Sequence, residues 1–213
     1  MAGRVITIAQ QKGGAGKTTL AAHLAIAWAG EGRSVALVDI DPQGSLAAWH
    51  QLRSERFGTG KTGIDFAAIT GWRTEAEVAR RARDHDIVVI DSPPQAETEA
   101  KLAIRAADLV VLPVQPSPMD VWATKPTLDL AAQEKVPVLL VLNRVPPRAN
   151  LVDSMLAKLG ELGADIAEAR IGNRVALATS MLEGRGVTET GRSTRAGEEI
   201  AAVAQEIWRR AQG

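Results

Sequence analysis

The sequence lacks cysteine altogether, although it is 213 residues long. Without a thiol the chain can form no disulfide, no thiolate metal site and no iron–sulfur cluster, and it has no cysteine nucleophile. Aromatic residues are also scarce, at 3% of the chain with no tyrosine. Little material therefore exists for stacking the bases of a single-stranded nucleic acid. These absences exclude several classes of redox, metal-binding and nucleic-acid-binding protein.

Net charge and long apolar runs are absent as well. The chain carries 25 lysines and arginines against 25 aspartates and glutamates, so any contact with nucleic acid has to come from a local patch. No apolar run approaches the length that spans a membrane. The first apolar stretch begins close to the N-terminus, without the pattern of a signal peptide. We therefore expect a cytoplasmic protein.

Strand and helix patterns alternate along the chain, which predicts an α/β fold: a mostly parallel, twisted sheet flanked by helices on both faces. No linker or repeat interrupts the alternation, so residues 1–213 are expected to form a single domain. Strands are predicted at residues 5–9, 35–38, 64–69, 87–90, 109–112 and 138–142, and near 166. Helices are predicted at residues 18–30, 44–53, 74–83, 98–107, 120–134, 151–162, 174–183 and 194–210. Pro113 is expected to end the strand before it.

A glycine-rich segment, Lys12-Gly13-Gly14-Ala15-Gly16-Lys17-Thr18, follows the first predicted strand and precedes a helix. This context is typical of a phosphate-binding loop, in which backbone N–H groups and the start of a helix surround the phosphates. We predict that Lys17 reaches the β- and γ-phosphates and that the Thr18 hydroxyl binds Mg²⁺. The predicted ATP-binding residues of the loop are Gly13, Gly14, Ala15, Gly16, Lys17, Thr18 and Thr19. The fold is therefore predicted to be a single-domain P-loop NTPase.

The loop departs from the standard pattern at one position. G-x-x-x-x-G-K-[ST] requires glycine where this chain has Gln11, and Lys12 adds a second lysine at the start of the loop. Lys12 has no evident role within its own subunit, so the loop predicts a partner subunit as well as a ligand. A second glycine–lysine segment at residues 58–62 lacks a preceding strand, and we interpret it as a surface loop.

Acidic residues close two of the predicted strands. Asp39 and Asp41 lie two positions apart, on one side of an extended chain. Beside a nucleotide such carboxylates hold the waters of Mg²⁺ and orient an attacking water. Asp91 follows the strongest apolar strand, as the Walker-B acid does. We predict Thr18, Asp39 and Asp91 as metal-binding residues; the alternatives are a strand-ending turn for Asp39 to Asp41 and a loop cap for Asp91.

Two later strands are followed by segments that we also expect near the nucleotide, because the carboxyl ends of parallel strands lie along one edge of the sheet. Residues 113–118 form a proline-stiffened loop, and Pro116 of this loop is included among the predicted ATP-binding residues. Asn143 and Arg144 follow the last strong strand and are included as well. Asn143 is expected either to read the adenine ring or to form a turn.

No Ser/His/Asp triad is indicated, because His23, His50 and His85 lie on or near helices away from the strand ends, where we expect surface positions. No residue pattern supplies a base for a substrate hydroxyl, as a kinase catalytic loop would. What remains is a nucleotide, a metal and a positioned water, which together favour ATP hydrolysis.

Four motifs together resemble the deviant Walker A ATPases of the ParA/MinD type. They match in order and spacing through roughly residues 4–144, and they are Lys12–Thr18, Asp39–Gln43, Ile90–Asp91 and Pro113–Pro118. Residues 180–184 further resemble the short ParA proteins, ParF among them. The variant loop at Gln11 agrees with this resemblance.

The resemblance implies an ATP-dependent sandwich dimer in which Lys12 reaches the partner's phosphates, so that Lys12, Lys17, Asp41 and Asp91 form the catalytic set. It implies weak, Mg²⁺-dependent ATP hydrolysis that a ParB-like or other small cargo-adaptor protein stimulates. It also implies an ATP dimer that binds DNA non-specifically, associates with the nucleoid and positions a cargo, which would be a plasmid, a chromosome region or a protein cluster.

Candidate DNA contacts are arginines in the last third of the chain, since backbone binding needs clustered positive charge. They are Arg170, Arg174, Arg185, Arg192 and Arg195, with Arg209 and Arg210 at the tail. Glutamates interleave with them, so a solvated surface of mixed charge is the alternative.

Two other functions on this fold remain open. A MinD-like membrane-cycling regulator would end in a basic amphipathic helix, whereas residues 206–213 offer one apolar pair and two arginines. We therefore expect the last helix to pack on the domain and do not expect a membrane partner. A metabolic ligase or kinase is disfavoured by Lys12 and by Asp41-Pro42-Gln43. The nitrogenase-iron-protein branch is excluded by the lack of cysteine, and the start of the first strand near Arg4 predicts no N-terminal helix-turn-helix domain.

Overall fold

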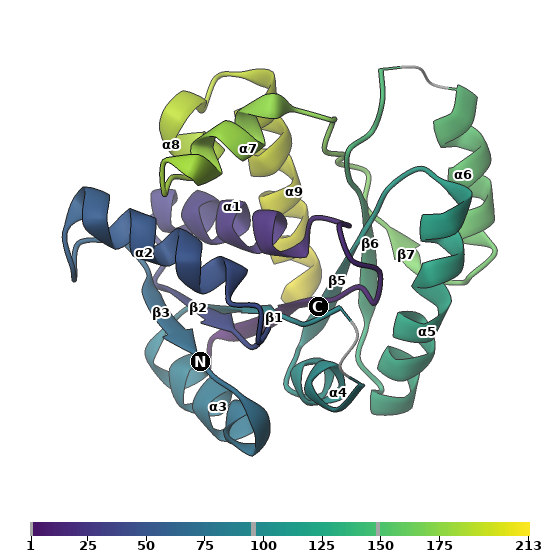
Figure 1. Cartoon of the computed structure of the whole chain (residues 1–213). Coiled ribbons are helices and arrows are strands. Elements are labelled where there is room, and N and C mark those ends of the chain that lie inside the picture. The colour runs from purple at the N-terminus through teal and green to yellow at the C-terminus, as the bar shows by residue number, and fades with distance from the viewer. Residues whose placement is uncertain (1, 95–96, 148–149) are drawn as a thin grey trace.

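One seven-stranded sheet carries the strands of the computed structural model, which describes residues 2–94, 97–147 and 150–213 (Figure 1). The strand order is β3-β2-β4-β1-β5-β6-β7, and each neighbouring pair is parallel. The strands are β1 (Arg4–Ile8), β2 (Val35–Asp39), β3 (Asp65–Ala68), β4 (Ile87–Asp91), β5 (Leu109–Val114), β6 (Val138–Leu142) and β7 (Asp165–Ile166). Parallel strands share a direction, so all their carboxyl ends lie along one edge.

Helices cover both faces of this sheet. The first face is covered by α1 (Lys17–Gly30), α2 (Ser45–Phe57), α7 (Val175–Leu182), α8 (Val187–Gly191) and α9 (Arg195–Ala211). The second is covered by α3 (Thr74–Asp84), α4 (Glu97–Arg105), α5 (Pro118–Glu134) and α6 (Asn150–Gly160), with a short 3₁₀ turn, η1 (Gly71–Arg73), before α3. The two groups lie on opposite sides of the strands in Figure 1. The predicted α/β architecture is confirmed.

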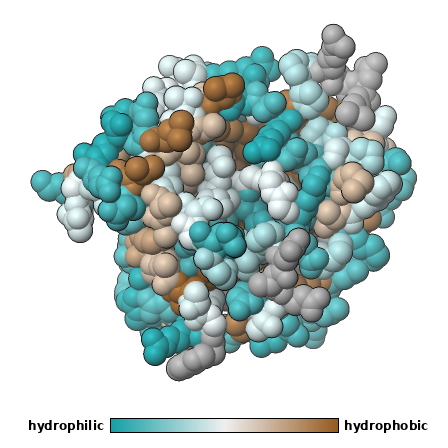
Figure 2. Space-filling model, viewed as in Figure 1, coloured by the Kyte–Doolittle hydropathy of each residue, from teal (hydrophilic) through white to brown (hydrophobic). Residues whose placement is uncertain are grey.

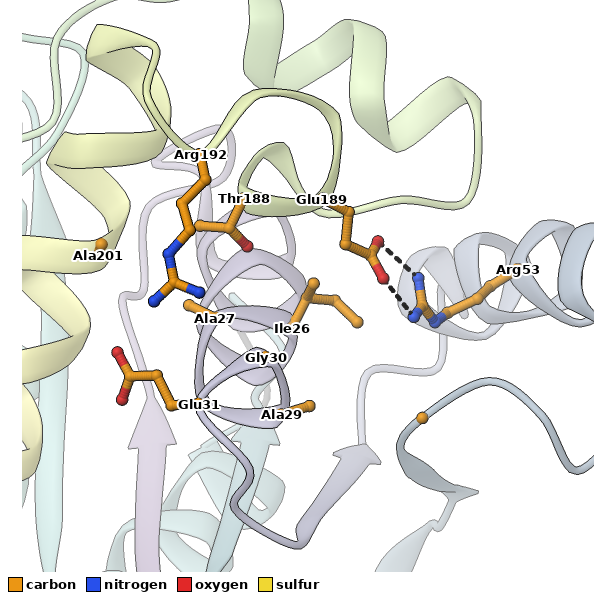
Figure 3. Close-up of a pocket in the computed structure, with 11 residues that line it drawn as sticks. Ile26, Ala27, Ala29, Gly30, Glu31, Arg53, Thr188, Glu189, Arg192 and Ala201 are labelled. Atoms are coloured by element: carbon orange, nitrogen blue, oxygen red, sulfur yellow. Dashed lines mark hydrogen bonds and ion pairs between the residues drawn. The ribbon is translucent and has the colours of Figure 1, made fainter.

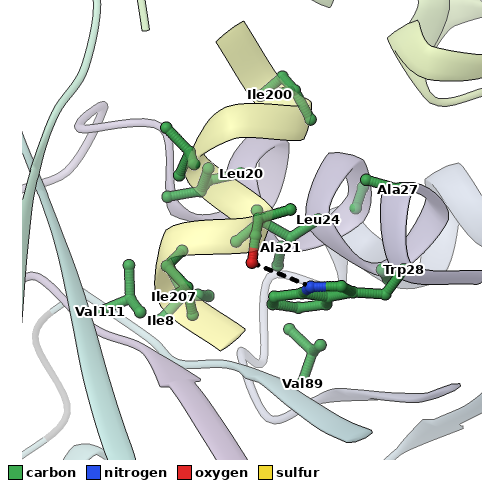
Figure 4. Close-up of a cluster of buried hydrophobic side chains, with 14 of the residues drawn as sticks. Ile8, Leu20, Ala21, Leu24, Ala27, Trp28, Val89, Val111, Ile200 and Ile207 are labelled. Carbon is green, nitrogen blue, oxygen red and sulfur yellow. Dashed lines mark hydrogen bonds between the residues drawn. The ribbon is translucent and has the colours of Figure 1, made fainter. Parts of the chain in front are cut away.

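The first face holds the largest core, because α1 is enclosed between the sheet and the C-terminal helices (Figure 4). Trp28 of α1 is fully buried, and its indole nitrogen donates a hydrogen bond of 3.1 Å to the Ala204 carbonyl of α9. Ile200, Val203 and Ile207 point from α9 into the same cluster. The last helix therefore packs on the domain through its apolar face, as its amphipathic pattern predicts. Among the described residues no helix has both the length and the apolar character to cross a membrane.

The prediction that Pro113 ends its strand is wrong, since β5 continues to Val114. Proline has no N–H to donate and is excluded from positions where a neighbouring strand needs one. Pro113 faces the β1 side of β5, and pairing with β1 stops at the Ile8–Val111 position. Beyond it the Gln10 side chain approaches the Pro113 carbonyl at 3.5 Å. The missing donor therefore costs no strand–strand hydrogen bond.

Helix α2 is longer than predicted, and α8 was not predicted at all. The helix predicted at residues 44–53 continues for four more residues, so α2 runs to Phe57. Arg53 in its last turns is only 4% exposed and forms a two-pronged ion pair with Glu189 of α8. Such a partner lies 136 residues away, and no local pattern reveals it. Residues 58–61 are exposed, which confirms the surface-loop interpretation for most of the second glycine–lysine segment, whereas Thr62 at its end is buried.

The prediction of a surface position for His23 is also wrong, because this side chain is completely buried. The Val187 N–H donates to its Nδ1 at 3.0 Å, so Nε2 carries the proton and donates to the Leu177 carbonyl at 3.2 Å. Burial lowers the pKa of His23 to about 4. His23 thus joins α1 to α7 and α8 as a neutral side chain, while His50 and His85 stay partly exposed.

Candidate nucleotide-binding site

The phosphate loop and both predicted acidic strand ends meet at the carboxyl edge of the central strands. Ile8 at the end of β1 pairs in register with Asp91 of β4, and Asp91 pairs in register with Asp39 of β2. The loop therefore emerges beside the two carboxylates that the sequence analysis singled out. In open parallel sheets this edge is where ligands bind.

The glycines of the loop occupy conformations that other residues rarely adopt. Gly14 and Gly16 have φ values of 79° and 93°, in the left-handed region that favours glycine. A Cβ atom on Gly16 would lie 2.6 Å from the side-chain nitrogen of Asn143. Helix α1 begins at Lys17, directly after Gly16, and no side chain caps its first turn. The N–H groups of that turn are therefore available to an anion.

Two side chains from neighbouring strand ends brace the loop. The Gln115 amide donates to the Gly14 carbonyl at 3.0 Å, and the Asn143 amide donates to the Ala15 carbonyl at 2.8 Å. The side-chain oxygen of Asn143 accepts from the Arg144 N–H at 2.9 Å. Asn143 is thus engaged at both ends of its amide, which favours a role in holding the loop over the predicted alternative of reading the adenine ring.

Asp91, Thr18 and Lys17 form the charged centre of the site. The Thr18 hydroxyl donates to Asp91 Oδ2 at 2.7 Å, whereas the buried Oδ1 has no partner among the described residues. Burial raises the pKa of Asp91 to about 7, and burial lowers the pKa of Lys17 against the attraction of Asp91 and Asp41. An unpartnered buried carboxylate beside a hydroxyl is a donor set that suits Mg²⁺.

Within the described ranges no three residues of the His, Cys, Asp and Glu types gather as a metal cluster. A Mg²⁺ ion bound to a nucleotide needs no such cluster, since it takes one or two protein ligands and completes its shell with phosphate oxygens and water.

Asp39 and Asp41 are placed differently by the turn between β2 and α2. Asp39 is 2% exposed, and its carboxylate accepts from the N–H groups of Asp41 and Ala47 at 3.0 and 2.9 Å. Burial raises the pKa of Asp39. Asp41 is partly exposed and faces the cavity above the loop. The geometry therefore engages Asp39 in holding the turn that presents Asp41, and the metal-binding role of Asp39 stays a prediction.

A cavity of about 600 Å³ lies above the phosphate loop, within the size range of small-ligand sites. Residues of the loop and first turn that line it are Gly13, Gly14, Gly16, Lys17, Thr18 and Thr19. Arg144 and the α7 side chains Met181 and Leu182 also line it, as does Asp41. A smaller hollow of about 260 Å³ continues past Asn143 and Arg144. Ala15 and Pro116 are buried and do not line the large cavity.

Lys12 has a partner within its own subunit, contrary to the prediction that it has no role there. Its ammonium lies 2.6 Å from Oδ2 of Asp120 in the first turn of α5. The Asp120 carboxylate is 1% exposed, Ser117 also contacts Oδ2 at 2.5 Å, and Oδ1 is buried without a partner among the described residues. The pair joins residues 108 positions apart, so no local sequence pattern reveals it.

The exposed face of α7 was not recognised from the sequence. Val175 and Leu182 are 82% and 79% exposed, although they belong to a helix whose Leu177 and Ser180 are buried. Figure 2 shows hydrophobic side chains at the surface where α2 and α7 lie in Figure 1, in agreement with these values and with the exposed Leu52. The spacing of Val175 and Leu182, two helical turns apart, was the signal that could have identified this apolar face.

The five predicted DNA-contacting arginines do not form one cluster. Arg170, Arg174 and Arg195 line a common hollow. Arg185 lies elsewhere, with its guanidinium 5.8 Å from the Phe57 ring, and Arg192 lines a different cavity. The structure therefore brings three of the five together.

That other cavity lies at the far end of α1 from the phosphate loop (Figure 3). It has about 220 Å³, an aliphatic floor from the last turns of α1, and the Arg53–Glu189 ion pair at one side. Since α1 has 14 residues, the cavity is roughly 20 Å along the helix from the loop. It is not part of the nucleotide site.

Comparison with known proteins agrees with the geometry of this site. The model of the CobQ/CobB/MinD/ParA nucleotide binding domain matches residues 6–187. The "Maintenance of carboxysome distribution protein A" of Gloeobacter kilaueensis is 37% identical over 216 residues, covering 97% of this chain and 96% of that protein. The protein of the same name from Halothiobacillus neapolitanus is 29% identical, covering 95% of each. "Protein ParA" of Rhizobium radiobacter is 30% identical, covering 81% of this chain and 79% of its own.

Solved structures share the fold at lower identity. A Cyanothece McdA variant in complex with ATP superposes with a TM-score of 0.81 at 17% identity, and 97% of each chain is covered. The cell division ATPase MinD of Pyrococcus furiosus superposes with a TM-score of 0.79 at 20% identity, covering 98% of this chain and 99% of the other.

Proposed function

Because this chain belongs to the CobQ/CobB/MinD/ParA nucleotide-binding family, we propose that it is a ParA-like positioning ATPase. It binds ATP with Mg²⁺, closes into an ATP-dependent sandwich dimer and binds DNA non-specifically. A small adaptor protein carried by the cargo stimulates hydrolysis and thereby releases the dimer. The protein acts as a nucleotide switch that moves a cargo over the nucleoid.

The observation that carries this proposal is the buried Oδ1 of Asp91, which has no partner in the described part of the chain and lies beside Thr18 and Lys17, below a nucleotide-sized cavity. Lys17 binds the β- and γ-phosphates, while Thr18 and Asp91 hold Mg²⁺. The metal, when bound, neutralises charge on the transferring phosphoryl group. Asp41 faces the cavity and orients the attacking water.

Slow hydrolysis follows from what surrounds Asp41. Among the described residues that line the cavity there is no histidine, and Asp41 is the one carboxylate that could take a proton from water. Positioning alone therefore supports a low basal rate, and a partner that improves the alignment of the water accelerates it. Loss of the γ-phosphate removes contacts across the dimer, which makes hydrolysis a switch.

Exposed apolar side chains near the cavity support the dimer. Val175 and Leu182 project from α7, and Leu182 lines the cavity itself. Met119 and Trp122 are 61% and 66% exposed on α5, on either side of the residue that holds Lys12. Exposed apolar patches of this kind mark interaction surfaces. In the dimer, Lys12 leaves Asp120 and reaches the phosphates of the partner subunit.

The relatives' names narrow the cargo to two types. Two relatives are named for carboxysome distribution and a third is named ParA. We therefore propose one of two cargo types. The first is a protein compartment such as a carboxysome, and the second is a DNA cargo, either a plasmid or a chromosome region. The MinD-like alternative, a membrane-cycling regulator, is disfavoured because the apolar face of α9 is buried in the core. This face is formed by Ile200, Val203 and Ile207.

ATP turnover tests this proposal. With Mg²⁺, the wild-type protein hydrolyses ATP slowly and responds to non-specific DNA together with the adaptor. Asp41→Ala retains ATP binding and loses turnover, because its target is the water and not the phosphates. Lys17→Ala is the control that loses nucleotide binding. Turnover in Lys17→Ala equal to that of the wild type would contradict the assignment, as would oligomeric behaviour that ignores the nucleotide.

A further inference from the structure

We propose that the hollow lined by Arg170, Arg174 and Arg195 is a groove for the phosphodiester backbone of DNA, and that Glu199 occupies two of these arginines, Arg174 and Arg195, until a phosphate replaces it. This inference rests on the proposed DNA binding and assigns it a place and a regulator. It also excludes Arg185 and Arg192 from that contact.

The groove is built from three segments, which are residues 145–147 after β6, the connection between β7 and α7, and the start of α9. Arg170 and Arg174 lie on the connection between β7 and α7, and Arg195 begins α9. The hollow measures about 300 Å³ and is open to solvent, with the Arg195 side chain 80% exposed. Among the described residues that line it, Glu199 is the acidic one. Three cations against one anion give this surface a local positive charge in a chain whose net charge is zero.

Glu199 marks where an anion sits in the groove. Its carboxylate accepts from Arg174 through Nη2 at 2.6 Å and Nε at 3.2 Å, and it also accepts from the Gly172 N–H at 2.9 Å. Arg195 Nε approaches the same carboxylate at 3.3 Å. A guanidinium fork joined by a backbone N–H is the donor arrangement that proteins use for phosphate. The internal carboxylate therefore stands where two phosphate oxygens fit.

Exchange of Glu199 for a phosphate is feasible because this ion pair is accessible. The side chains of Arg174 and Glu199 are 31% and 17% exposed. Ion pairs that contact water contribute little to stability, since water and salt compensate for their loss. Phosphates of one DNA strand, in contrast, can engage all three arginines at once and release condensed counterions. Glu199 therefore lowers DNA affinity without preventing binding.

The groove is continuous with the nucleotide site. Gly172 and Arg174 line both this hollow and the smaller one that contains Gly16, Asn143 and Arg144. Positive side chains thus extend from the phosphate loop to the first turn of α9. Closure of a dimer over ATP would place two such rows of positive side chains on one assembly. The added phosphate contacts would raise the affinity for DNA.

The other predicted arginines lack this setting. Nη1 of Arg185 lies 3.8 Å from Oε2 of Glu183, and the guanidinium lies beside the Phe57 ring. Arg192 lines the cavity at the opposite end of α1, beside Glu31 and Glu189. A groove lined by Arg170, Arg174 and Arg195 and a contact through Arg185 and Arg192 therefore predict that different variants lose DNA binding.

The test compares two charge-matched variants. Glu199→Gln keeps an acceptor for the Gly172 N–H and removes the negative charge from the groove. Glu198→Gln makes the same charge change at the adjacent, exposed position of α9. A labelled random-sequence duplex is titrated with ATP-loaded protein at two salt concentrations. Glu199→Gln binds about fivefold tighter than the wild type, with a steeper salt dependence, and Glu198→Gln stays within about twofold.

Arginine variants locate the contact. Arg170→Ala, Arg174→Ala and Arg195→Ala each weaken DNA binding by about tenfold and reduce the salt slope by about one. Arg185→Ala and Arg192→Ala leave both unchanged. Urea unfolding of each variant serves as the folding control, and Arg174→Lys replaces Arg174→Ala if the alanine variant is destabilised.

Each outcome decides a separate point. Equal affinity of Glu199→Gln and wild type overturns the role of Glu199. If Arg185→Ala and Arg192→Ala lose DNA binding while the variants of the groove arginines keep it, the groove is overturned and the proposed DNA binding stands. Absence of DNA binding in every ATP-loaded protein, Glu199→Gln included, overturns DNA binding itself. Binding of the same proteins to anionic phospholipid vesicles but not to the duplex would assign the groove to lipid headgroups and refute the proposal.

Discussion

At the scale of single residues, the most informative side chain is the carboxylate of Asp91. It is buried with one oxygen unpartnered among the described residues, and its pKa is raised to about 7 by burial. A folded protein without ligand gains little from such a group, because its charged form has lost water and the attraction of Lys17 offsets only part of that loss. The arrangement is explained when a metal–nucleotide complex supplies the missing charge.

This gives a prediction for Asp91→Asn without nucleotide. The folded pKa lies above that of the unfolded chain, so ionisation of Asp91 destabilises the folded state increasingly as pH rises from about 4 to 7. The shift corresponds to a destabilisation on the order of 4 kcal/mol at pH 8. Asp91→Asn therefore raises the urea midpoint at pH 8 and has little effect at pH 4. It also removes the stabilisation by Mg²⁺-ATP. A lower midpoint at pH 8 would contradict this view of the site.

A second prediction concerns the pair of Lys12 and Asp120. Lys12 cannot serve a partner subunit while it lies 2.6 Å from Asp120. Asp120→Asn should weaken this hold, so that ATP-dependent dimers form at protein concentrations about tenfold lower, as measured by light scattering. Lys12→Ala should retain some nucleotide binding by the monomer and lose the dimers.

The control for that experiment lies on the same helix. Asp129 forms an exposed pair with Lys125 in α5, and Asp129→Asn changes the charge equally without touching Lys12. Dimerisation of Asp120→Asn that matches Asp129→Asn would show that the pair does not restrain Lys12. Dimers of Lys12→Ala at wild-type levels would refute the role across the interface.

At the scale of elements, helix α7 combines a buried face with an exposed apolar one. Leu177 and Ser180 anchor it, while Val175 and Leu182 face solvent beside the cavity. A helix exposes large apolar side chains at no benefit to its own folding, so this face is expected to be covered in a complex. The proposed ATP dimer would be the complex that covers it.

The corresponding prediction is that Leu182→Glu abolishes ATP-dependent dimers. A charge on this face would be desolvated in the interface, which costs several kcal/mol. Leu182 is 79% exposed in the monomer. The free energy of unfolding, measured by urea denaturation, should therefore change by less than about 0.5 kcal/mol. Thr179→Glu, an exposed position of the same helix, is the matched control. Dimers of Leu182→Glu as stable as those of Thr179→Glu would place the interface elsewhere.

At the scale of the whole molecule, buried hydrogen bonds connect the nucleotide-binding helix to the C-terminal helices. His23 of α1 accepts from Val187 of α8 and donates to Leu177 of α7. Arg53 of α2 pairs with Glu189 of α8 and donates to the Gly184 carbonyl. These contacts hold α7 above the phosphate loop, so the position of the cavity wall depends on the integrity of the whole face.

His23 therefore predicts how stability depends on pH. Its folded pKa of about 4 lies below that of an unfolded histidine, about 6.5. The stability from neutral His23 is complete above pH 6.5 and is lost as pH falls towards 4, by on the order of 3 kcal/mol. Urea unfolding at pH 7 and pH 4.5 should show a larger loss for wild type than for His23→Gln, which cannot titrate. Equal losses for the two proteins would contradict the buried neutral state.

Much of the fold follows from local patterns in the sequence. Apolar runs such as residues 87–90 form strands because either face of a central strand is buried. The phosphate loop is equally local: Gly14 and Gly16 supply the backbone geometry, and Lys17 and Thr18 follow in the first turn of α1. Asp91 could be recognised because it closes a strand. Each of these signals lies within a few residues of the structure that it predicts.

The sequence by itself thus determined the alternating α/β architecture, the loop and the acid at the strand end. Only the tertiary structure decided which groups meet across the chain: Lys12 with Asp120, His23 with Val187, and Glu199 with Gly172 and Arg174. It also decided that Pro113 stays within β5, because β1 has already ended beside it. The reason is physical, since a polar side chain takes the partner that packing brings close, and packing joins segments that no local pattern connects.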